Sequence, residues 1–458
     1  MRGDTIVALA TPLGVGAIGI VRLSGREAIS IASRLFRARS GKCIEEFKSF
    51  RMYLGEIVDP ETKQAFDEAL CVVMRAPKSY TREDVVEFHL HGGPLVVRKA
   101  LEVCLREGAR LARPGEFTER AFLNGRIDLT QAEAVASIVR ASSEKVLELS
   151  LRHLAGAFGG KVRAWQERLL LVEAHLEASC DFPDVSLENV GDFVQRELWA
   201  LSSDIEEELR KSERLRPLEE GMLVVIVGKP NVGKSSLLNL LVGKERAIVT
   251  PFPGTTRDAI EEFVLLEGLP FRFVDTAGMR RSDDPVERVG VERARAYLGR
   301  ADYVIAVFDR SRPLEEEDTE LAGLVRSRPH LVVLNKSDLP PRLSLEELQK
   351  LYPDEPILEI SAFTGEGKEM LLEAIVRYFQ DCLGPEEDLS LLTARQKEEL
   401  RKILEICREA LRALESSVTL DVVSILLSEA LAGMKRLTGE NIDEKLLETL
   451  FSHFCVGK

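Results

Sequence analysis

The feature that most restricts the fold is a glycine-rich loop placed between an apolar segment and a segment of helical character. Residues 222–227 read Met-Leu-Val-Val-Ile-Val, and residues 228–235 continue as Gly-Lys-Pro-Asn-Val-Gly-Lys-Ser. A strand, a GxxxxGKS loop and a helix in this order form a phosphate-binding loop, because the glycines let backbone N–H groups turn toward phosphate oxygens. In such a loop Lys234 reaches the β- and γ-phosphates and the Ser235 hydroxyl binds Mg²⁺. The segment therefore predicts a nucleotide-binding α/β domain.

Two further motifs supply groups for a metal ion and the γ-phosphate. Residues 254–258 read Gly-Thr-Thr-Arg-Asp, and Thr256 is the threonine expected at Mg²⁺ and the γ-phosphate. An apolar stretch then leads into Asp-Thr-Ala-Gly at residues 275–278. There Asp275 is placed to hold Mg²⁺ through water, and the Gly278 N–H is placed to meet the γ-phosphate. Their order predicts a site for Mg²⁺ and a nucleoside triphosphate.

The last two motifs identify the base. Residues 335–338 read Asn-Lys-Ser-Asp, and the Asp338 carboxylate can accept from both donors on the guanine edge, a pair that adenine does not offer. Ser361 and Ala362 follow another apolar stretch and complete the base pocket. Five motifs in this order predict a GTPase rather than an ATPase. The expected nucleotide-binding residues are Asn231, Val232, Gly233, Lys234, Ser235, Ser236, Thr250, Pro251, Phe252, Pro253, Gly254, Thr255, Thr256, Asp275, Thr276, Ala277, Gly278, Asn335, Lys336, Asp338, Ser361 and Ala362.

One position departs from the usual pattern of Ras-like GTPases. The residue after the Asp-Thr-Ala-Gly motif is Met279, where these enzymes usually carry a glutamine that orients the attacking water. A thioether cannot orient water in this way. We therefore expect another residue to supply the missing polar group.

Composition sets the class of protein. Hydrophobic residues make up 45% and charged residues 30% of the 458 residues, as in soluble multidomain proteins, and no apolar run approaches the roughly 20 residues of a membrane helix. The N-terminus lacks a signal peptide, which favours the cytoplasm. Seven dispersed cysteines are typical of reduced thiols. A net charge of −14 argues against a surface coated in nucleic acid.

The pattern along the chain predicts a multidomain α/β plus α protein. Residues 1–118 mix apolar strand-like runs with helical stretches, and residues 119–216 carry apolar positions at helical spacing. Residues 217–380 form the Ras-like GTPase domain (G domain), and helical spacing returns over 381–458. We interpret this order as a G domain inserted into one helical domain; the alternative is two separate helical domains. Strands are expected at 6–10, 18–21, 70–74, 85–88, 222–227, 271–274, 331–334 and 357–360, and N-terminal helices near 26–37 and 94–107.

Three other sequence patterns could indicate a binding site or a modification, and their neighbouring residues help to interpret them. Residues 14–19 match GxGxxG, but a second strand-like segment follows in place of the helix that a dinucleotide site needs, so we expect a turn. His89 and His91 alternate on one strand without further ligands nearby, which favours a polar strand face over a metal site. Cys455 stands four residues from the end without a good prenylation signal, and its role stays open between a site residue and a structural thiol.

Motifs outside the G domain add a resemblance that spans the chain. They are Asp-Thr-Ile-Val-Ala at 4–8, Ile-Val-Arg-Leu-Ser-Gly at 20–25 and His-Gly-Gly-Pro at 91–94. Arg-Pro-Gly-Glu-Phe-Thr at 113–118 and Arg-Ala-Phe-Leu-Asn-Gly at 120–125 follow, and Phe-Cys-Val-Gly-Lys ends the chain. With these motifs, the sequence resembles the MnmE (TrmE) family of tRNA-modifying GTPases.

The resemblance implies a homodimer formed through the N-terminal domain, which binds a folate such as 5-formyltetrahydrofolate or methylenetetrahydrofolate. It implies a heterotetramer-type complex with the FAD-containing protein MnmG. Together they would place an aminomethyl or carboxymethylaminomethyl group on C5 of the wobble uridine of certain tRNAs. It further implies that paired G domains hydrolyse GTP in the presence of K⁺.

The family pattern also assigns roles to residues of this sequence. It places Asn231, Thr250, Phe252 and Thr255 around K⁺, and it makes Glu287 the catalytic residue that polarises water, where Met279 cannot. From the residues alone, Glu287 would be a solvated carboxylate in the charged run 283–288. The implied folate-binding residues are Arg22, Glu87, Arg126 and Lys458. The family often has lysine where this chain has Arg126, which keeps the charge but changes its geometry.

Two functions compete at this level. The first is an enzyme of tRNA modification whose GTPase cycle drives a conformational step. The second is a regulatory RNA- or ribosome-associated GTPase without chemistry on RNA. The N-terminal folate motifs separate the two, because an assembly GTPase has no use for a one-carbon donor.

Overall fold

The chain divides into two units, each of which contains one β-sheet. The first comprises Met1–Val139, Leu151–Ser203 and Thr393–Lys458, and the second comprises Arg140–Ser150 and Asp204–Leu392. The computed structural model describes residues 3–141, 143–181, 190–243, 261–275, 296–353, 355–385, 389–416, 420–454 and 457.

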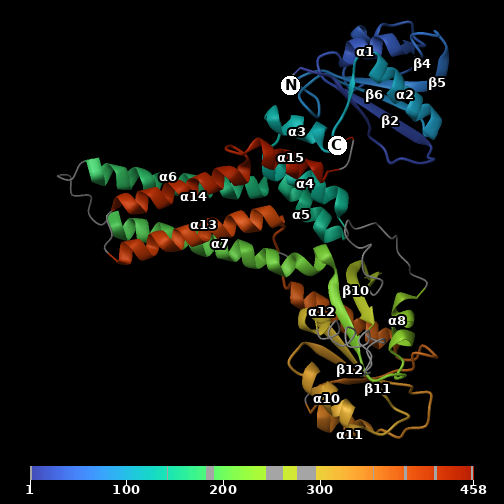
Figure 1. Ribbon diagram of the computed structural model, residues 1–458, viewed down its shortest axis with the longest axis vertical. Coiled ribbons are helices and arrows are strands. Elements are labelled where there is room, and N and C mark those ends of the chain that lie inside the picture. Colours follow the sequence, from blue (N-terminus) through green and yellow to red (C-terminus); the bar gives the residue numbers. More distant parts are fainter. Residues whose placement is uncertain are drawn as a thin grey trace, which may run out of the picture. The chain divides into compact units, whose positions relative to one another are not determined.

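The N-terminal sheet of the first unit has seven strands in the order β3-β4-β5-β6-β2-β1-β7, with helices α1 and α2 packed against it (Figure 1). Neighbouring strands are antiparallel except for β1 and β7. The elements are β1 Ile6–Leu9, β2 Ile18–Ser24, α1 Ala28–Leu35, β3 Phe36–Ala38, the short 3-10 helix Ile44–Glu46, β4 Met52–Val58, β5 Ala65–Met74, β6 Val85–His91, α2 Pro94–Arg106 and β7 Arg110–Leu111.

Alternation along β6 separates the two faces of this sheet. Val86, Phe88 and Leu90 belong to the core together with residues of α1 and α2. Glu87 and His89 therefore lie on the opposite face, because successive strand residues point to opposite sides. Residues 14–17 lie between β1 and β2, and β2 begins at Ile18. The turn expected at the GxGxxG match is thus confirmed.

The helical part of the first unit brings together segments that are far apart in sequence. In Figure 1, α14 runs beside α6 and α13. The apolar positions predicted on these helices, such as Leu169 and Leu400, are buried. The helices are α3 Glu116–Leu123, α4 Leu129–Arg140, α5 Glu144–Leu154, α6 Ala157–Asp181, α7 Val190–Glu220, α13 Ala394–Glu415, α14 Leu420–Thr438 and α15 Glu444–Ser452, of which α4, α5 and α7 also contain residues of the second unit.

A buried charge joins three of these helices within the unit. The Glu133 side chain of α4 is 5% exposed and accepts hydrogen bonds from Arg395, Thr393 and Gln396 at the start of α13. Arg395 also donates to backbone carbonyls at the end of α14. The pairing fixes the point at which the chain re-enters the first unit.

The sheet of the second unit has six strands in the order β13-β12-β11-β8-β10-β9, and only β9 pairs antiparallel among the pairings described. The central strands are apolar throughout because helices cover both faces of the sheet. The elements are β8 Met222–Val227, α8 Lys234–Val242, β9 Glu261–Leu266, β10 Leu269–Asp275, β11 Tyr303–Asp309, α10 Glu316–Val325, β12 His330–Asn335, α11 Leu345–Leu351, β13 Ile357–Glu359 and α12 Lys368–Leu383.

Parallel pairing places the functional motifs at one edge of this sheet. Strands β8, β10, β12 and β13 are followed or ended by the glycine-rich loop, Asp275, Asn335 and Ser361 respectively. Because the carboxyl ends of parallel strands meet at the same edge, the four motifs converge. The fold is the predicted one: an N-terminal α/β domain, a helical domain and a P-loop GTPase domain. Among the described helices, none combines the length and apolarity needed to cross a membrane.

Candidate functional site

The glycine-rich loop closes on the ammonium group of its own lysine. Lys234, the first residue of α8, is 6% exposed, and its Nζ donates to the carbonyls of Gly228 and Lys229, each at 2.8 Å. Burial lowers the pKa of Lys234, whereas the charge of Asp275 acts in the opposite direction. The loop thus holds the positively charged Lys234 side chain at the start of α8, where the helix dipole also favours a bound anion.

Both glycines of the loop are required by close contacts. Gly228 has a φ of +156°, and a Cβ there would lie 2.4 Å from the Val307 carbonyl oxygen of β11. Gly233 has a φ of +101°, and a Cβ there would lie 2.2 Å from Nδ2 of Asn335. Val307 of the sheet and Asn335 therefore lie so close to the two ends of the phosphate-binding loop that only glycine fits at either end.

Ser235 and Asp275 meet opposite this loop. The Ser235 hydroxyl donates to Asp275 Oδ2 at 2.6 Å, which joins α8 to the end of β10. A hydroxyl and a carboxylate at this distance are oxygen donors of the kind that Mg²⁺ prefers. Ser235 and Asp275, the two predicted Mg²⁺-site residues that the structure describes, therefore lie together.

Asn335 links the phosphate loop to the base loop. Its Nδ2 donates to the Val232 carbonyl at 2.8 Å, and its Oδ1 accepts from the Ala362 N–H at 2.9 Å. The Ser361 hydroxyl donates to Asp338 Oδ1 at 2.5 Å. The structure thus brings the predicted base-pocket residues from two loops into one bonded group.

Asp309, at the end of β11, contacts the predicted nucleotide-binding residue Lys336 and belongs to none of the five sequence motifs. It is 6% exposed, and its Oδ2 lies 2.6 Å from Nζ of Lys336, whose φ is +68°. Burial acts against ionisation of Asp309, but hydrogen bonds from Lys336 and Ser311 outweigh it and keep its pKa below the usual value. A signal was present, since an aspartate ending a fully apolar strand lies at the functional edge of a parallel sheet.

Twelve predicted site residues lie outside the described part of the chain. They are Thr250, Pro251, Phe252, Pro253, Gly254, Thr255, Thr256, Thr276, Ala277, Gly278, Glu287 and Lys458. Met279 and Cys455 fall in the same category.

A second group of polar residues lies on the face of the N-terminal sheet opposite to the core formed with α1 and α2. Arg22 of β2 faces Glu87 of β6 across the strands, and its Nε lies 2.6 Å from Glu87 Oε1. Arg22 Nη1 donates to the Gly457 carbonyl at 3.1 Å, so the end of the chain reaches this face. His89 Nε2 lies 3.3 Å from Glu87 Oε2. The predicted Arg22 and Glu87 thus form one charged group.

Tyr80 connects this group to Arg126. The Arg126 guanidinium lies 4.7 Å from the centroid of the Tyr80 ring, and Arg22 lies 6.0 Å from the same centroid. Arg22 also lies 5.7 Å from the Phe117 ring centroid, and the hydroxyls of Tyr80 and Thr118 are hydrogen-bonded at 2.9 Å. Two of the four predicted folate-binding residues, Arg22 and Arg126, therefore share the Tyr80 ring, and Glu87 joins them through its ion pair with Arg22. No spacing in the sequence pointed to Tyr80 or Phe117.

The two histidines of β6 have different partners. His89 contacts Glu87, whereas His91 Nδ1 lies 2.6 Å from Asp67. Within the described residues, no group of three or more His, Cys, Asp or Glu side chains is arranged to hold a metal ion. The interpretation as a polar strand face agrees with this arrangement.

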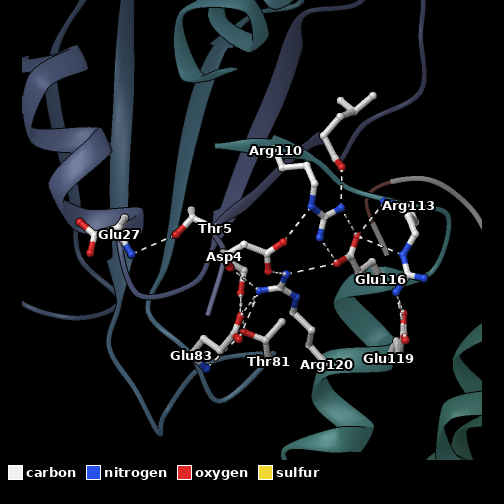
Figure 2. Close-up of polar contacts among 12 residues, drawn as sticks. Asp4, Thr5, Glu27, Thr81, Glu83, Arg110, Arg113, Glu116, Glu119 and Arg120 are labelled. Carbon is white, nitrogen blue, oxygen red and sulfur yellow. Dashed lines mark hydrogen bonds and ion pairs between the residues drawn. The ribbon is translucent and has the colours of Figure 1, made fainter. Parts of the chain in front are cut away.

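Residues of the motif at 113–118 take part in an ion network around the buried Glu116 (Figure 2). Glu116 is 3% exposed, and it accepts two hydrogen bonds from Arg110, one from the Arg113 N–H and one from Arg120. Arg110 and Arg120 also bind Asp4 near the start of β1. The network attaches α3 to the sheet, and Thr118 of α3 then bonds Tyr80.

Comparisons with known proteins cover the whole chain. The family described as GTP-binding protein TrmE N-terminus matches residues 5–126, and the family described as MnmE helical domain matches residues 129–455. The tRNA modification GTPase MnmE of Heliobacterium modesticaldum is 45% identical over 466 residues, covering 100% of each chain. That of Bacillus subtilis is 42% identical over 458 residues, covering 99% of this chain and 100% of its own.

A solved structure matches a smaller part. The G domain of the T. maritima FeoB iron transporter is 30% identical, covers 35% of this chain and 99% of its own, and has a TM-score of 0.27. The two family matches and the full-length relatives lead to one conclusion: this chain belongs to the MnmE (TrmE) family of tRNA modification GTPases.

Proposed function

We propose that this chain is the GTP-hydrolysing component of a complex that modifies C5 of the wobble uridine of tRNA. The group added is an aminomethyl or carboxymethylaminomethyl group, its one-carbon unit comes from a tetrahydrofolate, and the partner is the FAD-containing protein MnmG. One observation carries the proposal: the chain combines a bonded guanine-type base loop with a separate cluster of arginine, glutamate and aromatic side chains. A regulatory GTPase without chemistry on RNA has no need of the second cluster.

In the G domain, each described residue has a distinct task. The carboxylate of Asp338 accepts the two guanine donors, and Ser361 holds that carboxylate in place. Lys234 carries positive charge to the β- and γ-phosphates. Ser235 and Asp275 would hold Mg²⁺, which supplies charge neutralisation at the phosphates when bound. Thr256 would complete the metal site, and the remaining nucleotide contacts would come from the backbone of residues 231–236, 250–256 and 275–278.

Hydrolysis would depend on a monovalent cation and a carboxylate. Asn231, Thr250, Phe252 and Thr255 would hold K⁺, whose fixed charge beside the phosphates acts as an arginine finger does in other GTPases. Glu287 would polarise the attacking water through a bridging water. Support for this assignment comes from the family pattern and from Met279, which cannot orient water.

The N-terminal cluster would bind the folate. The guanidinium groups of Arg22 and Arg126 suit carboxylates of a glutamate tail, and the Glu87 carboxylate suits pterin N–H donors. Lys458 would add a further positive charge, and the neighbouring Gly457 carbonyl lies 3.1 Å from Arg22. The rings of Tyr80 and Phe117 offer flat apolar surface to a flat heterocycle. These residue types fit a folate better than they fit a purely apolar ligand.

The proposal extends to the assembly. The chain would act in the cytoplasm as a homodimer formed through the N-terminal domain, with MnmG and tRNA as partners. The working domain boundaries are 1–118 for the folate-binding domain, 119–216 and 381–458 for the helical domain, and 217–380 for the G domain.

Titration of the full chain with 5-formyltetrahydrofolate tests the proposal. Arg22→Ala removes a guanidinium that pairs with Glu87, so we expect folate affinity to fall by about a hundredfold while GTP affinity is unchanged. Calorimetry with each ligand measures both. Arg98→Ala is the matched control, because Arg98 is an exposed arginine of α2 in the same domain. If the unmodified chain binds no folate, the folate assignment of the N-terminal domain is wrong, and the alternative of a GTPase without chemistry on RNA is favoured.

A further inference from the structure

The second residue of the phosphate-binding loop, Lys229, is directed toward a neighbouring helix. Its Nζ lies 2.7 Å from Glu315 Oε2 and 2.6 Å from Asp318 Oδ2, and its side chain is only 13% exposed. Glu315 is the N-cap of α10 and Asp318 lies in its first turn. The Lys229 ammonium group thus pairs with two carboxylates of α10. Lys234, by contrast, donates to the backbone carbonyls of the loop itself.

The Asp318 carboxylate, which accepts from Lys229, is held in place by the capping box of α10. Asp318 is 4% exposed, and its Oδ2 accepts the Glu315 N–H at 2.9 Å as part of the capping box that begins the helix. Burial disfavours the charge of Lys229, but hydrogen bonds to Asp318 and Glu315 outweigh it and raise the pKa of Lys229. A buried, capped carboxylate is a rigid anchor, so the pair ties the loop to a helix rather than to a mobile surface side chain.

Lys229 is also bound through its backbone. Its carbonyl accepts from Lys234 Nζ at 2.8 Å, so one residue connects α10 to the lysine expected at the phosphates. Two residues further on, Asn231 has a φ of +63°, in the left-handed region that non-glycine residues rarely adopt. Such a conformation costs about 1 kcal/mol or more and persists only where the surroundings hold it. The loop is held downstream by the bond from Asn335 to the Val232 carbonyl, and upstream by Lys229.

We propose that Lys229 is a positioning residue for GTP hydrolysis, which braces the segment 228–231 against α10. The brace keeps the Asn231 side chain in place for the cation and keeps the Lys234 ammonium group at the loop. The Lys229 ammonium group is paired with Glu315 and Asp318, so it would act through the loop that it holds. The inference rests on the proposed K⁺-dependent hydrolysis. It adds Lys229, Glu315 and Asp318 to the residues on which that hydrolysis would depend.

The test compares Lys229→Met and Lys229→Arg in the full chain, with Lys350→Met as the control on the exposed surface of α11. GTP turnover is measured over a range of K⁺ concentrations, together with GDP affinity and the thermal midpoint. We expect Lys229→Met to raise the K⁺ concentration for half-maximal turnover and to lower kcat, each by about tenfold, because a small misplacement of catalytic groups has effects of this size. Arginine, which keeps the charge, should restore most of both.

The partners give an independent comparison. Asp318→Asn should shift the K⁺ dependence in the same direction as Lys229→Met, whereas Glu315→Gln, at a side chain that is 61% exposed, should have a smaller effect. These variants also serve if Lys229→Met does not fold. A lower thermal midpoint with unchanged K⁺ dependence and kcat in both Lys229→Met and Asp318→Asn would overturn the inference and leave a stabilising ion pair only.

Failure of the underlying proposal gives a different result. If the unmodified protein turns over GTP equally in K⁺ and Na⁺, the cation mechanism is wrong, whatever the variants do. The brace would then still predict a lower kcat for Lys229→Met, with rescue by arginine, in either salt. Unchanged kcat in that case would refute the brace as well.

Discussion

At the scale of single residues, the nucleotide site is built from side chains that hold one another. Asn335 bonds Val232 and Ala362, Ser361 bonds Asp338, and Ser235 bonds Asp275. Each motif residue therefore positions a residue of another motif. Because the bonds cross between loops that are far apart in sequence, loss of one side chain should change the geometry of its partner as well as its own contact.

Asp338→Asn tests the base pocket at this scale. The amide presents one acceptor and one donor to a guanine edge with two donors, so we expect GTP affinity to fall by roughly thirtyfold, or about 2 kcal/mol. Xanthosine triphosphate, whose C2 carbonyl accepts from the amide, should gain relative to GTP. Competition binding with both nucleotides measures the ratio. Glu369→Gln, at an exposed carboxylate in the first turn of α12, is the control, and an unchanged ratio in Asp338→Asn would contradict the assignment.

At the scale of elements, α3 depends on buried charge for its attachment to the N-terminal sheet. Glu116 at its first turn is bound by Arg110, Arg120 and the Arg113 N–H (Figure 2). Burial opposes its ionisation, but these hydrogen bonds outweigh burial and hold the pKa of Glu116 below its usual value. A carboxylate with a lowered pKa stabilises the fold above its usual pKa, and this contribution is lost as the pH falls through the lowered value.

Glu116→Gln should therefore lower the free energy of unfolding of the first unit by about 2 kcal/mol near neutral pH, since the arginines lose a buried partner. The difference between the variant and the unmodified chain should shrink as the pH falls below about 4.5, near the usual pKa of glutamate. Urea unfolding followed at several pH values measures it. Glu448→Gln, an exposed partner of Arg113, should change stability by less than about 0.5 kcal/mol. A constant difference at all pH values would show that Glu116 acts by packing alone.

At the scale of the whole molecule, two chemically different sites lie on different units of one chain. The nucleotide site belongs to the second unit and the proposed folate site to the first. The chain passes between the units four times, because α4, α5 and α7 each contain residues of both and the last passage precedes α13. This connectivity suits a protein in which GTP hydrolysis in one unit drives a change in the other.

The cation dependence of hydrolysis is the prediction at this scale, because it requires a complete G domain in its assembled form. We expect turnover of GTP by the full chain to be at least about tenfold faster in K⁺ than in Na⁺ at equal ionic strength, since a cation of the right size supplies charge where no arginine finger is assigned. Steady-state phosphate release in the two salts measures it. Equal rates would exclude Asn231 as part of a cation site.

The motifs in the sequence were enough to predict the GTPase fold and, through the resemblance, the family. A glycine-rich loop, Asp275, Asp338 and Ser361 lie at strand ends, and parallel strands bring their carboxyl ends to one edge, so local spacing was enough to predict that these residues meet. The same rule applied to Asp309, at the end of an apolar strand, but no motif marked it. Strands β4, β9 and β11 were not predicted, although a fully buried strand such as β11 carries a plain apolar run.

The side chains that surround Arg22, and those that contact Lys229 of the phosphate-binding loop, could not be predicted from the sequence because they depend on tertiary packing. Tyr80, Phe117 and Gly457 reach Arg22 from three distant segments, and Lys229 finds Asp318 nearly ninety positions away. The residues in these contacts are not separated by any regular sequence spacing, because the contacts form where separate elements pack. A strand or a loop follows from short-range geometry, whereas a partner across the fold depends on the register of a sheet and the placement of a helix.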